Sequence, residues 1–159
     1  MQRMGWVAAT ACAAAVAMGG AQFVGAQGQG VDDQKHRRPC SEATLRGDYG
    51  GQIQGTRPAP GGLTESVIGV ILRTYDGHGN IDQVDNVKGS ITGIVPDRPG
   101  FGTYEVSPNC TGIARFQPGP GILIEERLVI VDNGREIRSV TASPAPVMVT
   151  GIHQRIHTR

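Results

Sequence analysis

Aromatic side chains, a charge excess of one sign and cysteine are all scarce in this chain of 159 residues. Phe, Trp and Tyr make up 4% of the residues, and the formal net charge is only +1. The near balance of charge disfavours a nucleic-acid-binding protein, whose surface is basic, and also an acidic solvating tail. Neither Cys40 nor Cys110 belongs to a CxxC motif or has a histidine beside it, so the sequence does not support a thiol-based metal or redox site.

Glycine and proline are abundant by contrast, with 24 and 10 residues. Such a content is too high for a helical bundle, whereas the hydrophobic fraction of 38% is too high for a fully disordered chain. The length is that of about one domain. The composition therefore favours a single globular domain rich in turns.

The N-terminal segment has the pattern of a secretory signal peptide. Arg3 precedes an uncharged stretch rich in Ala and Val, and Val24-Gly25-Ala26 supplies the small residues that signal peptidase requires. We expect a signal peptide over residues 1–26, a disordered polar spacer over 27–39 and the folded domain over 40–159. An uncleaved anchor is the alternative, but the stretch is only weakly apolar. No other segment is apolar enough to span a bilayer.

The predicted export determines how the cysteines are interpreted. After signal cleavage only Cys40 and Cys110 remain. Because exported proteins meet an oxidising environment, we expect these two residues to form a disulfide bond. The expected location is secreted or periplasmic.

Alternation of apolar and polar residues recurs along the rest of the chain and predicts strands. Residues 57–62 are expected to form a loop, residues 96–100 a turn, and Asn133-Gly134 a type I′ hairpin. The expected strands are 45–53, 66–75, 81–88, 90–95, 102–106, 111–117, 122–132, 135–142 and 147–156.

Short connections between these strands predict an all-β, antiparallel meander. About eight strands closed into a small barrel is the favoured architecture, because closure removes the exposed sheet edges. A β-sandwich is the alternative.

Three motifs carry a resemblance to known proteins: Leu45-x-Gly47-x-Tyr49 after Cys40, the Asp76-Gly77-x-Gly79-Asn80 turn, and Gly102-Thr103-Tyr104-x-Val106 leading to Cys110 and Gly112. As a set over residues 40 to about 155, they resemble small exported bacterial proteins of unassigned function. The resemblance implies a barrel of the lipocalin or allene-oxide-cyclase shape. That shape hosts both carriers and enzymes, so it does not determine function.

Charged residues interrupt the most apolar strand. Alternation places Glu126 on one face with Ile124 and Leu128, and Glu125 with Arg127 on the other, so whichever face is internal carries a charge. Arg115 and Arg138 are the expected partners for that charge. We predict Glu126, Arg115, Tyr49 and Tyr104 as ligand-binding residues.

Metal and nucleophile motifs are weak. The alternating Asp76, His78, Asn80 and Asp82 are explained by a turn, position 12 of a calcium loop would be Val87, and Ser90 is not in a GxSxG motif. We expect no metal and no cofactor.

The leading functional hypothesis is a non-enzymatic barrel that binds an apolar small molecule or a partner surface. A cofactor-free isomerase or cyclase that uses Glu126 with a tyrosine, and a purely structural envelope protein, are the alternatives. Two strands, 66–75 and 122–132, are apolar on both faces, which also predicts a homo-oligomer.

Overall fold

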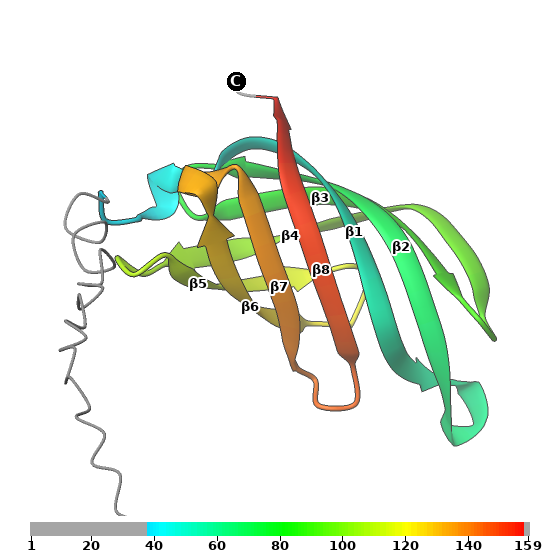
Figure 1. Ribbon diagram of the computed structural model, residues 1–159. Helices are drawn as coiled ribbons and strands as arrows, with labels where there is room; N and C mark the ends of the chain where they lie inside the picture. The colour runs from blue at the N-terminus through cyan, green and yellow to red at the C-terminus, as the bar shows by residue number, and fades with distance from the viewer. Residues whose placement is uncertain (1–37, 158–159) are drawn as a thin grey trace, which may run out of the picture. The chain divides into compact units, whose positions relative to one another are not determined.

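The computed structural model describes residues 38–157, which form a closed barrel of eight antiparallel strands (Figure 1). Each strand pairs with the next along the chain, and β8 pairs with β1. The predicted signal peptide and most of the predicted spacer lie outside the described residues. The strands are β1 (Arg46–Ala59), β2 (Leu63–Asp76), β3 (Asn80–Gly89), β4 (Gly93–Val106), β5 (Thr111–Gln117), β6 (Ile124–Val131), β7 (Glu136–Ser143) and β8 (Met148–His157).

The predicted all-β meander is confirmed, and the barrel is found in place of the alternative sandwich. Closure gives every strand two hydrogen-bonded neighbours, so the described sheet has no free edge. Strand β5 has the predicted bounds, and β2, β3, β6, β7 and β8 differ from them by one to three residues at either end.

The predicted turn over residues 96–100 is wrong. Residues expected to form two strands and a turn belong to one strand, β4. Pro96 and Asp97 together oppose the single residue Asn86, and the Asn86 side chain accepts a hydrogen bond from the Asp97 backbone N–H. Such a bulge accommodates proline, which cannot donate a backbone hydrogen bond, without ending the strand. The bulge also changes the alternation, so that Arg98 points into the barrel.

A second predicted connection is also wrong. Residues 57–59 extend β1, and only Pro60–Gly62 form the turn. The predicted turn at Asn133-Gly134 is found: both residues have positive φ, as a type I′ turn requires, and the Arg135 N–H donates to the Asp132 carbonyl at 3.1 Å. Gly134 packs there against the carbonyl of Thr44, a tertiary contact that a local turn signal does not contain.

One end of the barrel is filled by an apolar cluster built around three tyrosines. The Tyr75 ring makes edge contacts with Tyr49 and Tyr104, with centroids 5.2 and 4.9 Å apart. The cluster is completed by buried aliphatic residues and by alanine, namely Leu45, Ile81, Ala114, Leu128, Ile130 and Ile137.

The N-terminal segment of the domain closes this end. It contains a short 3-10 helix, η1 (Glu42–Thr44), and the Tyr104 hydroxyl donates toward the carbonyls of Glu42 and Leu45, both at 2.9 Å. Cys40 and Cys110 form the predicted disulfide bond, which links this segment to the connection between β4 and β5. Disulfides persist in oxidising compartments, so the bond indicates folding in one.

No helix in the described part of the chain is long and apolar enough to cross a membrane.

Candidate functional site

Charged side chains occupy the middle of the barrel, where a small β-barrel usually holds only apolar ones. Arg73 on β2 is fully buried, and its Nη1 donates to Oε2 of Glu126 on β6 at 2.9 Å. Arg73 also donates to Oε1 of Gln83, at 3.1 Å from Nε and 2.8 Å from Nη2. Burial opposes the charge of Arg73, but Glu126 and Tyr75 raise its pKa above the usual value. The guanidinium is therefore a permanent cation inside the barrel.

A second buried ion pair lies next to the first. Nε and Nη2 of Arg98 donate to the two carboxylate oxygens of Asp85, at 2.9 and 3.0 Å. Gln83 joins the two pairs, because its amide nitrogen donates to Asp85 while its oxygen accepts from Arg73. Forked pairs of this kind hold both partners in a fixed orientation.

His153 on β8 is the third polar group of this layer. It is fully buried, and neither ring nitrogen has a hydrogen-bond partner in the described residues. Burial, together with the nearby Arg73, lowers the pKa of His153 to about 3, so the imidazole is neutral at pH 7. Its ring packs over Gly51, where any side chain would overlap with it. The glycine therefore makes room for the histidine.

A cavity of about 290 Å³ lies on the other side of the charged layer from the tyrosines. Its polar lining includes Glu126, Asp85, Arg98, Arg57 and Thr141. Its walls are apolar and come from six strands and the adjoining connections: Ile53, Pro58, Val67, Ile71, Val87, Phe116, Pro118, Ile122, Ile124, Val147 and Val149. An apolar cavity with a few convergent polar groups is the usual form of a small-molecule site.

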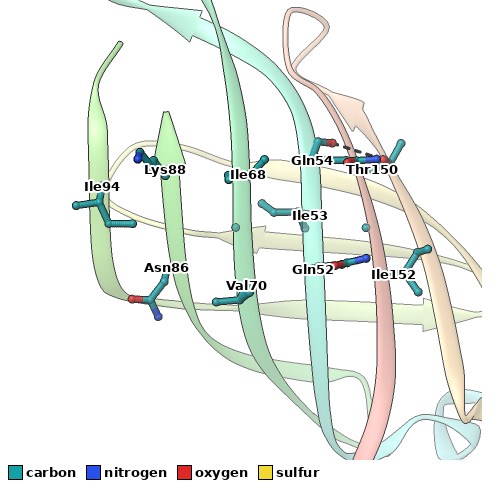
Figure 2. A pocket seen from close by; sticks show the side chains of 12 residues that line it. Gln52, Ile53, Gln54, Ile68, Val70, Asn86, Lys88, Ile94, Thr150 and Ile152 are labelled. Carbon is teal, nitrogen blue, oxygen red and sulfur yellow. Dashed lines mark hydrogen bonds between the residues drawn. The ribbon is translucent and has the colours of Figure 1, made fainter. Parts of the chain in front are cut away.

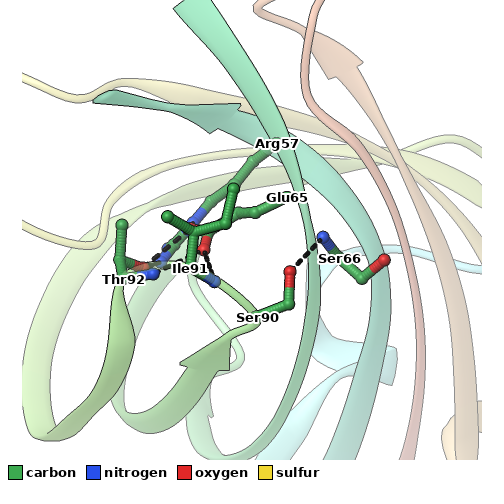
Figure 3. A network of polar contacts seen from close by, with 6 residues as sticks. All are labelled: Arg57, Glu65, Ser66, Ser90, Ile91 and Thr92. Carbon is green, nitrogen blue, oxygen red and sulfur yellow. Dashed lines mark hydrogen bonds and ion pairs between the residues drawn. The ribbon is translucent and has the colours of Figure 1, made fainter. Parts of the chain in front are cut away.

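A hydrogen-bond network around Glu65 holds the rim of this cavity together (Figure 3). Its carboxylate accepts from the backbone N–H groups of Ile91 and Thr92, from the Thr92 hydroxyl, and from Nε of Arg57 at 2.8 Å. These bonds, led by that of the Thr92 N–H, lower the pKa of Glu65 to about 2. The network joins the β1–β2 hairpin to the β3–β4 connection and fixes the position of Arg57.

The structure brings only one of the four predicted ligand-binding residues to the cavity. Glu126 lines it. Arg115 lies on the outer face, with ion pairs to Glu105 and Glu125 at 3.0 and 2.9 Å. Tyr49 and Tyr104 are buried in the closed end, where the Tyr49 hydroxyl bonds the Gly134 carbonyl and accepts from Arg155. A binding role for these four residues stays a prediction.

The predicted partners of the internal charge are wrong. Glu126 pairs with Arg73, while Arg115 pairs with Glu125 and Arg138 pairs with Glu136. Adjacent strands place Arg115 opposite Glu125 on the outside of the barrel, whereas Arg73 reaches Glu126 across the interior. Contacts across a barrel join strands that are not neighbours, so neither register nor alternation reveals them.

Sequence reasoning also missed Arg98 and His153. Arg98 fell within the residues assigned to a turn, and the bulge that turns it inward has no clear sequence signal. The alternation in β2 did contain a signal for Arg73, because Arg73 shares the inward face of Ile71 and Tyr75.

The turn at Asp76 uses its carboxylate internally. Oδ1 accepts from the backbone N–H groups of His78 and Asn80, and Oδ2 accepts from the Asn80 side chain. The bonds with Asn80 dominate and lower the pKa of Asp76 to about 2. The Asp76 oxygens are therefore occupied by the turn itself. Among the described residues, no group of three or more His, Cys, Asp or Glu side chains is arranged to hold a metal ion.

The outer face of the barrel carries a separate apolar groove (Figure 2). It runs over β8, β1, β2, β3 and β4, with short or polar residues on β1 between taller aliphatic residues on the neighbouring strands. Ile68, Val70 and Leu72 of β2 are 62%, 60% and 48% exposed. The groove faces open solvent and contains no buried charge, so the internal cavity is the stronger candidate for a small-molecule site.

No protein-family model and no curated protein matches this chain.

Proposed function

We propose that this protein is a secreted or periplasmic barrel that binds an apolar small molecule in its internal cavity without converting it chemically. The observation that carries the proposal is the asymmetric filling of the barrel. One end is packed with tyrosines and aliphatic residues, and the other end is left as a cavity of about 290 Å³ above a charged layer. That volume lies just below the range of about 300–1,000 Å³ for drug-sized ligands, so the site suits a small molecule.

The state of Glu126 favours binding over catalysis. An isomerase or cyclase needs a general base that takes up a proton from the substrate. Proton uptake by Glu126 would leave the permanently charged Arg73 buried without its counter-charge, because the two side chains form an ion pair at 2.9 Å. The tyrosines do not offer an alternative base, because burial raises the pKa of Tyr75 and raises that of Tyr104 to about 12. These contacts support a carrier rather than an isomerase or cyclase.

The cavity also favours binding over a purely structural role, because packing it closed would stabilise a structural barrel. Export is supported by the signal-peptide pattern over residues 1–26 and by the Cys40–Cys110 disulfide bond. We further propose that the chain belongs with the small exported bacterial proteins that it resembles, on the basis of its three motifs and the barrel shape.

The test is a comparison of two valine variants, with the neutral fluorophore N-phenyl-1-naphthylamine as probe. Val149 lines the cavity, whereas Val129 is 51% exposed on the outer face of β6. We expect the mature protein and Val129→Phe to bind the probe with saturation, and Val149→Phe to lose saturable binding. Mass spectrometry of extracts should detect any copurifying molecule with the mature protein and with Val129→Phe, and should detect less of it with Val149→Phe. Equal binding by all three proteins would contradict the proposal.

A further inference from the structure

The charges that line the cavity are balanced. Each cation of this region pairs with one carboxylate: Arg57 with Glu65, Arg73 with Glu126, and Arg98 with Asp85. A charged ligand would introduce an unpaired charge into a site of low polarity, which is strongly unfavourable. The site therefore selects against carboxylates, phosphates and amines, although two arginines line it.

Several hydrogen-bonding atoms of the cavity-lining side chains have no partner among the described residues, and two of them belong to the buried ion pairs. Oε2 of Glu126 accepts from Arg73, but Oε1 has no hydrogen-bond partner among the described residues. The Arg98 atoms Nε and Nη2 bond to Asp85, and Nη1 has no partner among the same residues. Since both side chains line the cavity, Glu126 offers it a charged acceptor and Arg98 a charged donor beside apolar walls.

From this we infer that the ligand is an uncharged apolar molecule with a hydroxyl group, an alcohol or a phenol, whose O–H donates to Glu126 and whose oxygen accepts from Arg98. A hydroxyl is the smallest neutral group that both donates and accepts a hydrogen bond. A ketone or an ether only accepts, so it would leave the buried Glu126 oxygen without a donor. This inference rests on the proposed function, because it names the ligand class of the same cavity.

The test uses three naphthalenes of similar size at pH 7: 2-naphthol, 2-methoxynaphthalene and 2-naphthoate. Each is titrated against the probe complex of the mature protein. We expect 2-naphthol to bind at least about tenfold tighter than the ether, because a hydrogen bond to a charged group is lost with the ether. The carboxylate should bind more weakly than 2-naphthol.

Glu126→Gln provides the second measurement. An amide that keeps its oxygen toward Arg73 presents an N–H donor to the cavity, so the preference for the alcohol over the ether should shrink or reverse. The matched control is Glu125→Gln, since Glu125 lies on the outer face and should leave the order unchanged. If Glu126→Gln fails to fold, the order measured with the wild-type protein still decides.

The outcomes separate the two proposals. Tightest binding of 2-naphthoate, or equal binding of the alcohol and the ether, would overturn the hydroxyl class while leaving a ligand-binding barrel. If none of the three compounds displaces the probe and no molecule copurifies, the proposed function itself fails.

The outer apolar groove carries a second, independent inference. The groove covers five strands, and the exposed fractions of its aliphatic side chains range from 42% to 62%. These residues are Ile68, Val70, Leu72, Val84, Ile94, Ile152 and Ile156. A contiguous apolar patch on a soluble domain usually marks an interface. The expected spacer has little apolar surface to offer the patch, because residues 27–37 contain a single aliphatic residue, Val31.

The charges at the two ends of β3 indicate what covers the patch. Lys88 and Asp82 are both exposed on its outer face, at opposite ends of the strand, with Val84 and Asn86 between them. A two-fold axis that lies in the interface, perpendicular to β3 and level with Asp85, stacks this strand antiparallel on its own copy. Lys88 then faces Asp82 of the second copy at both ends. We propose that the groove binds a second copy of this chain in an isologous dimer.

Sedimentation velocity of the mature protein at micromolar concentration tests the dimer. We expect a dimer that Val70→Lys converts to monomer, while the matched control Val129→Lys, on the outer face of β6, leaves it intact. Lys88→Asp and Asp82→Lys should each weaken the dimer, and the double exchange should restore it. Circular dichroism confirms that each variant is folded. A wild-type monomer, or a dimer that survives Val70→Lys, would overturn the inference.

Discussion

Arg73 and Glu126 form an ion pair across the inside of the barrel, between strands that are not neighbours in the sheet, with 2.9 Å between Nη1 and Oε2. The side chains are 0% and 6% exposed. A buried pair of this kind has a large desolvation cost, so it is weak evidence for stability by itself. The position of the pair matters more, because it lies between the packed end of the barrel and the cavity, which Glu126 lines.

Breaking this pair on one side should be more harmful than removing it entirely. Glu126→Ala leaves the Arg73 cation buried without a counter-charge, and we expect it to lower the free energy of unfolding by about 3–5 kcal/mol. The double variant Arg73→Met with Glu126→Leu should lose less than either single replacement. Denaturant unfolding measures the loss for Glu126→Ala, for Arg73→Met and Glu126→Leu alone, and for the double variant. A loss below about 1 kcal/mol for Glu126→Ala would show that the pair does not form.

The disulfide bond should contribute strongly to stability. Cys40 and Cys110 are 70 residues apart. In the chain-entropy model, closing a loop of that length lowers the entropy of the unfolded chain and so raises the free energy of unfolding by roughly 4 kcal/mol. Cys110→Ser should therefore lower the melting temperature clearly. Titration of the folded exported protein should find no free thiol in the mature chain, and two reactive thiols would contradict the bond.

Stability should fall in mild acid because of His153. Its pKa is about 3 in the folded protein and near 6.5 in the unfolded chain, so only the unfolded chain gains this proton between those values. The free energy of unfolding should decrease by about 1.6 kcal/mol from pH 6.5 to pH 5. The carboxyl groups of Glu65 and Asp76, whose pKa values are lowered to about 2, are ionised in both the folded and the unfolded protein over this range. They therefore affect the pH dependence of stability only at lower pH.

His153→Gln removes the titrating group and should flatten this pH dependence, whatever its effect on stability at pH 7. The measurement is the urea midpoint between pH 5 and pH 7 for both proteins. An unchanged slope in the variant would assign the effect to another group.

Two adjacent glycines provide a test of packing. A side chain at Gly51 would overlap with the His153 ring, so Gly51→Ala should cost about 1–3 kcal/mol through overpacking. Gly50 faces outward, where the added methyl meets a methyl of Ile156 at an ordinary 3.4 Å, and Gly50→Ala should be nearly neutral. Combining Gly51→Ala with His153→Ala should recover part of the loss. Thermal unfolding compares the four proteins, and equal effects of the two single changes would contradict the packing.

The sequence by itself determined the sheet and which residues share a face of a strand. Alternation correctly placed Ile124, Glu126 and Leu128 on one face of β6, and the short connections correctly predicted a meander closed into a barrel. These properties are local, because strand alternation and turn chemistry depend on neighbouring residues. The predicted export and the number of cysteines were likewise enough to predict the disulfide bond, which the structure confirms.

Only the tertiary structure decided which charges meet inside the barrel and where space remains. Arg73 reaches Glu126 because closure brings β2 and β6 face to face, and Arg98 points inward because a bulge changes the alternation of β4. The close approach of Gly134 to the Thr44 carbonyl is a tertiary contact that the Asn-Gly signal does not contain. The cavity depends in the same way on side chains from strands far apart in the chain, and their distances are set by closure and not by any local pattern.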